Sequence, residues 1–408
     1  MSTILKIDRF GPIENLELEI SRGTYVTIGL PNKGKSYLMK LLFLITRLHQ
    51  SPVLGGPEDP EGAFKFMFKE LYGEEGVKLF NASKFEIYGY LYNLTFEEGR
   101  VEIEEKEVDL VPSSCEAGSR TEVNLTEASL DVLSTSNLIA VMPPRNEKER
   151  LALLVGGLIV GTSYCEVEMT VPIFTGRGFS RMKEKVDVAL LPFSVFLPHG
   201  RSFVIEHYSL SQEYPMEFSG YLKLYQSMRY RLTVYPWLKA LELNKDRLSE
   251  TQIVNKVMKE VTGGYVEVKN GKLLFKGVNS TVMVHSSADA VKELVALASS
   301  EILASSNPFS YLFIEEPENQ LHPRAQAILA KTLPNIAEVL MFTTHSPFMI
   351  IGSCLNSKRR VRFVYLGKEA TVLSCKEIMN EIPEITEVSL EQLEEVDKNW
   401  NIITSKEN

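Results

Sequence analysis

The sequence is poor in cysteine and has no excess of positive charge. Its 408 residues include four cysteines, Cys115, Cys165, Cys354 and Cys375, and no two of them form a C-x-x-C pair. Cysteines scattered in this way favour reduced thiols over a disulfide framework or a zinc site. The formal net charge of −9 excludes an overall basic field for nucleic acid, but it does not exclude a local basic groove.

Long hydrophobic runs are also missing. No stretch of about 18 consecutive apolar residues occurs, so the sequence predicts no transmembrane helix. The N-terminal stretch Met1–Asp8 is interrupted by charged residues, which argues against a signal peptide. We therefore expect a cytoplasmic protein with no membrane partner. A hydrophobic fraction of 44% is still ample for a buried core.

The sequence does contain a glycine-bounded loop between a predicted strand and a predicted helix. Residues 29–36 read G-L-P-N-K-G-K-S and fit G-x-x-x-x-G-K-[ST], a loop whose backbone N–H groups wrap nucleotide phosphates. The flanking strand (25–28) and the helical apolar spacing from residue 38 to residue 48 argue against the alternative, a chance turn. Lys35 is then expected to reach the β- and γ-phosphates, and Ser36 to bind Mg²⁺. The predicted nucleotide-binding residues are Gly29, Leu30, Pro31, Asn32, Lys33, Gly34, Lys35, Ser36 and Tyr37.

Two further predicted strands end in residues suited to phosphate chemistry. The apolar run 311–314 leads into Glu315 and Glu316, and the run 337–342 leads into T-T-H-S-P with His345. Carboxylates at the carboxyl end of a parallel strand lie where ligands bind in open α/β sheets. We predict that Glu315 belongs to the Mg²⁺ shell, that Glu316 polarises the attacking water, and that His345 contacts the γ-phosphate. The alternative for the two glutamates is a solvated pair at a strand end.

Together, the phosphate loop, the E-E-P-E-x-x-L-H-P run (315–323) and the T-T-H-S-P run resemble ABC-class ATPase heads. Within that class they are most similar to stand-alone AAA-type proteins related to the SMC, Rad50 and overcoming-lysogenization-defect ATPases. The resemblance implies an ATP-dependent homodimer with two ATPs between the subunits, and DNA or a protein as a further partner. It also implies a serine-containing signature helix, here Ser286 and Ser287, that meets nucleotide on the other subunit. Ala288 and Asp289 replace the usual glycines.

Other candidate residues have weaker support. Arg145 follows the predicted strand 138–142 and resembles the arginine that related proteins carry between their two Walker motifs, where it would contact nucleotide. A surface arginine after a Pro-Pro turn is an equal alternative. His199 and His207 show no metal-ligand spacing, so we interpret both as structural, near a predicted strand over 203–208.

The expected fold is α/β, a P-loop NTPase of the ABC-ATPase head type with a mixed, largely parallel sheet, an antiparallel β-subdomain and a mostly helical insertion. Residues 1–145 and 262–408 are expected to form the ATP-binding head, and residues 146–261 the insertion or arm. The predicted activity is Mg²⁺-dependent hydrolysis of ATP to ADP and phosphate by an ATP-gated dimer, in DNA maintenance or defence. The alternative is a nucleotide-dependent switch or scaffold for a protein partner, with little hydrolysis.

Overall fold

The structure is a computed structural model with full side chains. It describes residues 3–48, 56–57, 59–89, 92–105, 140–141, 163–175, 178–190, 193–213, 233–305, 310–355, 360–367 and 369–386.

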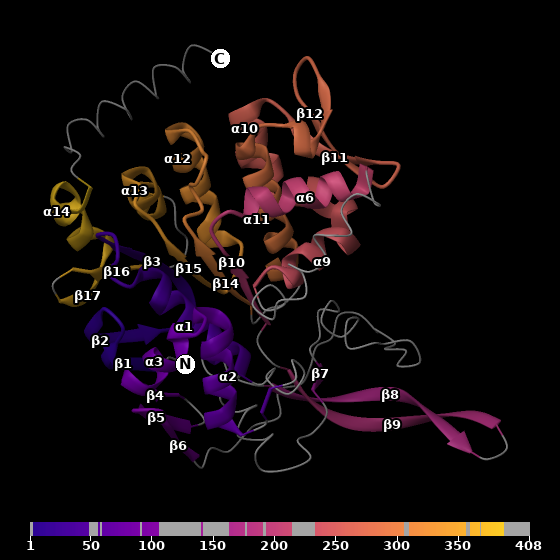
Figure 1. Cartoon of the computed structure of the whole chain (residues 1–408). Coiled ribbons are helices and arrows are strands. Elements are labelled where there is room, and N and C mark those ends of the chain that lie inside the picture. Colours follow the sequence, from indigo (N-terminus) through magenta and orange to yellow (C-terminus); the bar gives the residue numbers. More distant parts are fainter. Residues whose placement is uncertain are drawn as a thin grey trace.

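A six-stranded sheet lies at the centre of the molecule, with strand order β10-β14-β15-β3-β16-β17 (Figure 1). All neighbouring strands are parallel except β16 and β17, which are antiparallel. The strands are β10 (Phe193–Leu197), β14 (Ser310–Glu315), β15 (Val339–Thr343), β3 (Gly23–Gly29), β16 (Val361–Leu366) and β17 (Ala370–Leu373). This arrangement confirms the predicted α/β class with a largely parallel sheet.

Both faces of the central sheet are buried, and successive side chains of each strand enter different cores. Leu312 and Leu340 join one apolar cluster, whereas their neighbours Phe313 and Met341 join the other. This alternation is the period-2 geometry of a strand. The first cluster contains residues of α6 (Arg201–Glu213), α9 (Tyr235–Asn244), α11 (Asp289–Ser305), α12 (Pro323–Thr332), α13 (Pro347–Leu355) and α14 (Cys375–Thr386). The second contains those of α1 (Lys35–Arg47), α2 (Pro60–Tyr72) and α3 (Glu75–Ala82).

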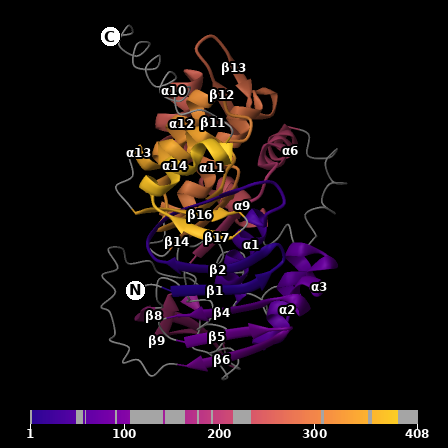
Figure 2. The same ribbon diagram turned by 90° about the vertical axis from the view of Figure 1, so that its left-hand side faces the viewer.

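The second cluster also covers an antiparallel sheet of order β2-β1-β4-β5-β6, which lies beside the central sheet (Figure 2). Its strands are β1 (Thr3–Phe10), β2 (Ile13–Ile20), β4 (Lys84–Tyr88), β5 (Tyr92–Glu97) and β6 (Arg100–Glu105). Glu98 and Gly99 turn the chain between β5 and β6, with φ values of 48° and 85°. Stacked rings of Phe85 and Phe96, 4.6 Å apart, form part of the core. The predicted antiparallel β-subdomain is therefore present.

The segment expected to be a mostly helical insertion contains helices, a long hairpin and a strand of the central sheet. β8 (Ser163–Thr175) and β9 (Gly178–Leu190) form a hairpin that projects from the body in Figure 1, and β7 (Ala140–Val141) pairs with β9. β10 pairs with β14 because its apolar residues Val195, Phe196 and Leu197 are buried. The predicted strand over 203–208 is wrong, since these residues lie in α6.

Shorter elements complete the described chain. The Asn270-Gly271 turn has φ values of 52° and 75°, as a two-residue hairpin requires, and joins β11 (Tyr265–Lys269) to β12 (Lys272–Lys276). The others are η4 (Lys245–Glu250), η5 (Ile253–Met258), α10 (Lys259–Thr262), β13 (Thr281–Met283), η6 (Val284–Ser286) and η7 (Leu333–Asn335). None of the helices in the described ranges is long and apolar enough to cross a membrane.

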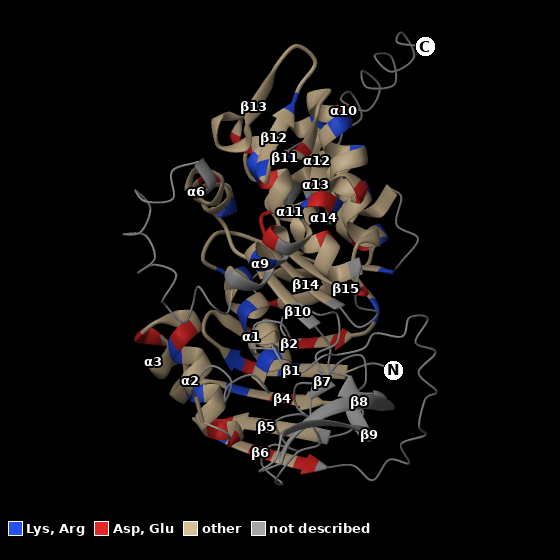
Figure 3. Ribbon diagram, turned by 90° about the vertical axis from the view of Figure 1, so that its right-hand side faces the viewer, with Lys and Arg blue, Asp and Glu red and all other residues tan. Residues whose placement is uncertain are grey.

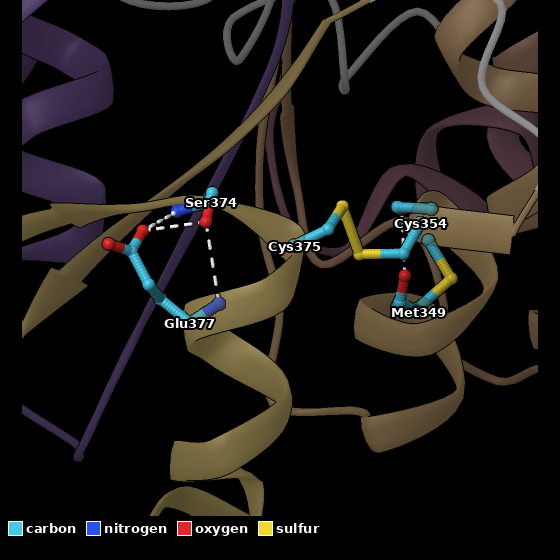
Figure 4. Close-up of a disulfide and its surroundings, with 6 residues drawn as sticks. Met349, Cys354, Ser374, Cys375 and Glu377 are labelled. Atoms are coloured by element: carbon cyan, nitrogen blue, oxygen red, sulfur yellow. Dashed lines mark hydrogen bonds between the residues drawn. A yellow bond between two sulfur atoms is a disulfide. The ribbon is translucent and has the colours of Figure 1, made fainter.

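A disulfide joins the end of α13 to the start of α14, between Cys354 and Cys375 (Figure 4). The expectation of reduced thiols is therefore wrong for this pair. The two cysteines are 21 residues apart in sequence, and the chain returns through β16 and β17 to bring their Cα atoms within 5.7 Å. That proximity arises from the sheet topology, which spacing alone does not reveal. Cys115 lies outside the described residues.

Candidate active site

The candidate site lies at the carboxyl edge of the central sheet. Because β3, β15, β14 and β10 run parallel, the segments that follow all four strands emerge at this edge. These segments are the phosphate loop after β3, Thr344 and His345 after β15, Glu316 after β14 and His199 after β10. Ligands of open α/β sheets bind at such an edge. The topology therefore brings together the loop and the acidic residues that the sequence motifs singled out.

The phosphate loop depends on two glycines. Gly29 has a φ of 145°, and a Cβ at this position would lie 2.4 Å from the Leu366 carbonyl oxygen of β16. Gly34 has a φ of 93°, and its Cβ would lie 2.6 Å from Cγ1 of Ile13 in β2. L-residues with side chains rarely adopt such backbone conformations. The loop is thus fixed between β16 and the β1–β2 turn, and α1 begins directly after it at Lys35.

Lys35 is folded into the phosphate loop, where its Nζ donates hydrogen bonds to the carbonyl oxygens of Gly29 at 2.8 Å and Leu30 at 3.0 Å. Burial lowers the pKa of the Lys35 ammonium, and the negative charge of Glu316 opposes that shift. Lys35 and Glu316 follow β3 and β14, whose carboxyl ends lie at the same edge of the central sheet. The predicted placement of Lys35 in the loop is therefore consistent with the geometry.

The Glu316 carboxylate lies between two histidines. His199 Nε2 is 3.6 Å from one of its oxygens, and His345 Nε2 is 4.0 Å from the other. Burial lowers the pKa of His345, Lys35 lowers it further, and Glu316 opposes both effects. Burial and the Lys35 charge therefore both disfavour the protonated form of the His345 imidazole. The sequence interpretation of His199 as structural did not foresee this contact, which places its ring beside the predicted catalytic carboxylate.

Glu315 is more enclosed than Glu316, with 9% of its surface exposed. One of its carboxylate oxygens accepts a hydrogen bond of 3.1 Å from the His199 backbone N–H. Among the described residues, no three His, Cys, Asp or Glu side chains form a metal cluster. Mg²⁺ bound beside phosphates does not need such a cluster, because it keeps several waters and takes one or two protein oxygens in addition to the phosphate oxygens. The Ser36 hydroxyl and the Glu315 carboxylate fit that donor set.

Glu318 is a buried carboxylate that the sequence motifs did not single out. It accepts hydrogen bonds from the Thr344 hydroxyl at 2.5 Å and from the His345 backbone N–H at 3.1 Å. Burial raises its pKa, and these hydrogen bonds partly offset the effect. Glu318 therefore fixes the backbone that carries His345. The sequence signal that could have identified Glu318 is its position in the E-E-P-E run.

Ser286 is the last residue of η6 and Ser287 follows it, shortly before α11. The Ser287 hydroxyl donates to the Val284 carbonyl oxygen at 2.6 Å. Within the described part of the chain, no hydrogen bond or ion pair joins either serine to the phosphate loop. Asp289 pairs with Lys292 at 3.0 Å, which reduces the negative charge that Asp289 adds beside the serines. Arg145 lies outside the described residues.

Comparison with known proteins gives a family match in the C-terminal half of the chain. Residues 238–350 match the family model described as an AAA ATPase domain, a range that includes Glu315, Glu316 and His345 and begins after the phosphate loop. This match supports an AAA-type ATPase domain over these residues. No curated protein matches the chain.

Two solved structures are loosely similar over nearly the whole chain. One is the Smc head domain from Pyrococcus furiosus, with an extended coiled coil and bound to the C-terminal domain of ScpA; it is 14% identical, covers 94% of this chain and 100% of its own, and has a TM-score of 0.43. The other is the SMC head domain from Thermotoga maritima, which is 9% identical. The alignment covers 91% of this chain and 98% of that structure, with a TM-score of 0.40.

Proposed function

We propose that this chain binds ATP with Mg²⁺ and hydrolyses it to ADP and phosphate, with Glu316 as the residue that orients and activates the attacking water. The observation that carries the proposal is the Glu316 carboxylate, held 3.6 Å from His199 and 4.0 Å from His345 and within electrostatic reach of Lys35. Phosphoryl transfer requires positioning and charge stabilisation more than covalent chemistry, and this constellation provides both.

Each residue has a distinct part in the proposed reaction. The amides of the phosphate loop and the N-terminus of α1 bind the phosphates, and Lys35 exchanges its two carbonyl contacts for phosphate oxygens. Ser36 and Glu315 would hold Mg²⁺, which neutralises phosphate charge when bound. Glu316 accepts a hydrogen bond from water, and His345 contacts the γ-phosphate side of the site. His199 supports the second oxygen of the Glu316 carboxylate.

The Glu316→Gln variant tests the proposed role. We expect kcat to fall by roughly 100-fold or more, because the amide cannot accept a proton. The dissociation constant for ATP, measured by calorimetry, should stay within about twofold because the phosphate loop is unchanged. Glu260→Gln, an exposed carboxylate on α10, is the matched control and should hydrolyse ATP at the wild-type rate. A Glu316→Gln variant with unchanged turnover would contradict the assignment.

We further propose that ATP joins two copies, with Ser286 and Ser287 of one copy facing nucleotide on the other. The resemblance to ABC-class heads supports this arrangement, as does the local bonding of Ser287, which contacts Val284 rather than its own phosphate loop. Light scattering of the Glu316→Gln variant should then show a dimer with ATP and a monomer with ADP. A monomer under both conditions would contradict it.

A separate experiment tests whether DNA or a protein partner is the effector of ATP hydrolysis. DNA that stimulates ATP hydrolysis with a steep salt dependence would support a role in DNA maintenance or defence. A rate unaffected by DNA, with a protein partner that binds only the ATP form, would support the alternative of a nucleotide-dependent switch.

A further inference from the structure

Arg201 and Glu293 form a buried ion pair beside the candidate active site. Arg201 Nε and a Glu293 carboxylate oxygen are 2.6 Å apart, and both side chains have 0% of their surface exposed. The contact is an ion pair without an aligned N–H···O hydrogen bond. Arg201 is the first residue of α6, and Glu293 lies in the second turn of α11. Burial of two charges is costly, so a pair of this kind calls for an explanation beyond packing.

The contacts on the other edge of the Arg201 guanidinium provide this explanation. Its two terminal nitrogens donate hydrogen bonds to the main-chain carbonyl oxygens of the two acidic residues, Glu315 at 2.7 Å and Glu316 at 2.9 Å. A third hydrogen bond of 3.3 Å reaches the carbonyl oxygen of Pro198, next to His199. The planar fork of an arginine places its donors on three separate nitrogens in a fixed geometry, whereas a lysine has a single donor nitrogen. One side chain thus holds both the acidic segment and the histidine segment.

The backbone of Glu316 needs such support. Its φ of 43° lies in the left-handed region, which costs energy for a residue with a side chain. On its amide side, Glu316 donates to the Thr343 carbonyl oxygen at 3.1 Å and to the Thr343 hydroxyl at 3.1 Å. On its carbonyl side, the acceptor is held by Arg201. The direction of the Glu316 carboxylate therefore depends on both contacts.

We propose that Arg201 is a positioning residue of the hydrolytic site, anchored by Glu293, and that it holds Glu316 in the left-handed conformation that aims its carboxylate between His199 and His345. The inference rests on the proposed function, because it assigns no chemistry of its own to Arg201. Glu293 fixes the guanidinium from α11, and its second carboxylate oxygen accepts a hydrogen bond of 3.3 Å from the Ser202 backbone N–H. The pair thereby connects α6, α11 and the end of β14.

The Arg201→Lys variant tests this role. Lysine keeps a positive charge, but its single nitrogen replaces three that contact Glu293 and the carbonyl oxygens of Glu315 and Glu316 together, so we expect kcat to fall at least about tenfold. The dissociation constant for ATP should stay within about twofold, because Lys35 and Ser36 are untouched. The matched control is Arg47→Lys, since Arg47 is also buried and donates to a main-chain carbonyl, that of Ser194 in β10, at 3.1 Å. It should leave kcat within about twofold of wild type.

A second variant keeps the test valid if Arg201→Lys fails to fold. Arg201→Met combined with Glu293→Leu removes both buried charges, a replacement that folded proteins tolerate. It should show the same selective loss of kcat with ATP affinity retained. Unchanged kcat in either folded variant, or a parallel loss of kcat and ATP affinity in both, would overturn the proposal. Glu316→Gln is measured alongside. If it hydrolyses ATP as fast as wild type, the proposed function fails; if it is inactive while Arg201→Lys is fully active, only this inference fails.

Discussion

The side chains around Glu316 differ in how far they are exposed, and this difference separates their roles. Glu316 is 37% exposed, His199 58% and His345 46%, so all three are accessible to water and substrate. Arg201 and Glu293 behind them are fully buried. The accessible groups can contact water and ligand directly, whereas Arg201 and Glu293 have no exposed surface and contact the backbone of the site. The site therefore has an accessible outer group, Glu316, His199 and His345. Behind it lies a buried inner support, Arg201 and Glu293.

His199 offers a direct test of the outer group. We expect His199→Ala to lower kcat by roughly 100-fold, because Glu316 loses the imidazole beside one of its carboxylate oxygens. Steady-state kinetics over a range of ATP concentrations measures the change.

His207→Ala is its control. That histidine lies on α6, with Nδ1 2.9 Å from the Phe203 carbonyl oxygen, and its removal should change kcat by less than about twofold. Equal effects of the two substitutions would contradict a specific role for His199.

The sequence was informative about residues within recognisable patterns and uninformative about those outside them. Lys35, Glu315, Glu316 and His345 lie in motifs, and the structure brings them to one edge of the sheet. His199 has no neighbouring metal ligand or motif, and only the pairing of β10 with β14 places it near Glu316. Such proximity depends on a strand pairing between segments more than a hundred residues apart, which local patterns do not encode.

The phosphate loop and α1 behave as one element because the loop ends where the helix begins. Gly34 is the N-cap of α1 and has no side chain to cap it, so the exposed N–H groups of the first turn remain available to an anion. Its left-handed φ and the nearby Ile13 leave no room for a side chain. The orientation of the helix N-terminus thus depends on this glycine.

Gly34→Ala should therefore damage both stability and nucleotide binding. The unfavourable φ alone costs about 1–2 kcal/mol, and the 2.6 Å approach to Ile13 forces the loop to move. We expect ATP affinity to fall at least about tenfold in calorimetry.

The comparison variant is Gly73→Ala. Gly73 has a φ of 73°, but a Cβ added there would meet nothing within 4 Å, so only the backbone strain of about 1–3 kcal/mol applies. ATP affinity should be unchanged in that variant. Loss of affinity in both would mean that destabilisation, rather than loop geometry, is responsible.

Among the elements, those with an apolar face were predictable and α6 was not. The predicted helix after the phosphate loop corresponds to α1, whose apolar residues at helical spacing are buried. In α6 the fully buried positions Arg201, Ile205 and Ser209 are spaced by four residues, as in a helix. Two of the three are polar, so the apolar pattern shows no helical period, and the short run 203–208 resembles a strand instead.

At the scale of the whole molecule, the central sheet combines strands from both ends of the chain, and charges of both signs are spread over the described elements (Figure 3). The central sheet takes β3 from the N-terminal part and β14, β15 and β16 from the C-terminal part. The Cys354–Cys375 disulfide adds a covalent link between α13 and α14 in the C-terminal part of the chain. In the unfolded state, the bond limits the conformations of the segment that forms β16 and β17.

Reduction of this disulfide should lower the free energy of unfolding by about 3 kcal/mol, the effect expected when a loop of this length is opened. The two cysteines are separated by 21 residues. Urea denaturation with and without dithiothreitol measures the difference. Cys354→Ser should have the reduced protein's stability and should not respond to dithiothreitol. A wild-type protein whose denaturation midpoint is the same under both conditions would contradict a stabilising bond.

The position of β3 between β15 and β16 has a consequence for synthesis. All seven residues of β3 are buried, yet both of its neighbours in the sheet are translated about 310 or more residues later. At roughly 5–20 residues per second, the ribosome needs about 15–60 s to cover that distance. Throughout that interval the first apolar strand has no native partner in the central sheet. The phosphate loop is therefore among the first parts of the chain to be made and among the last to reach its working shape.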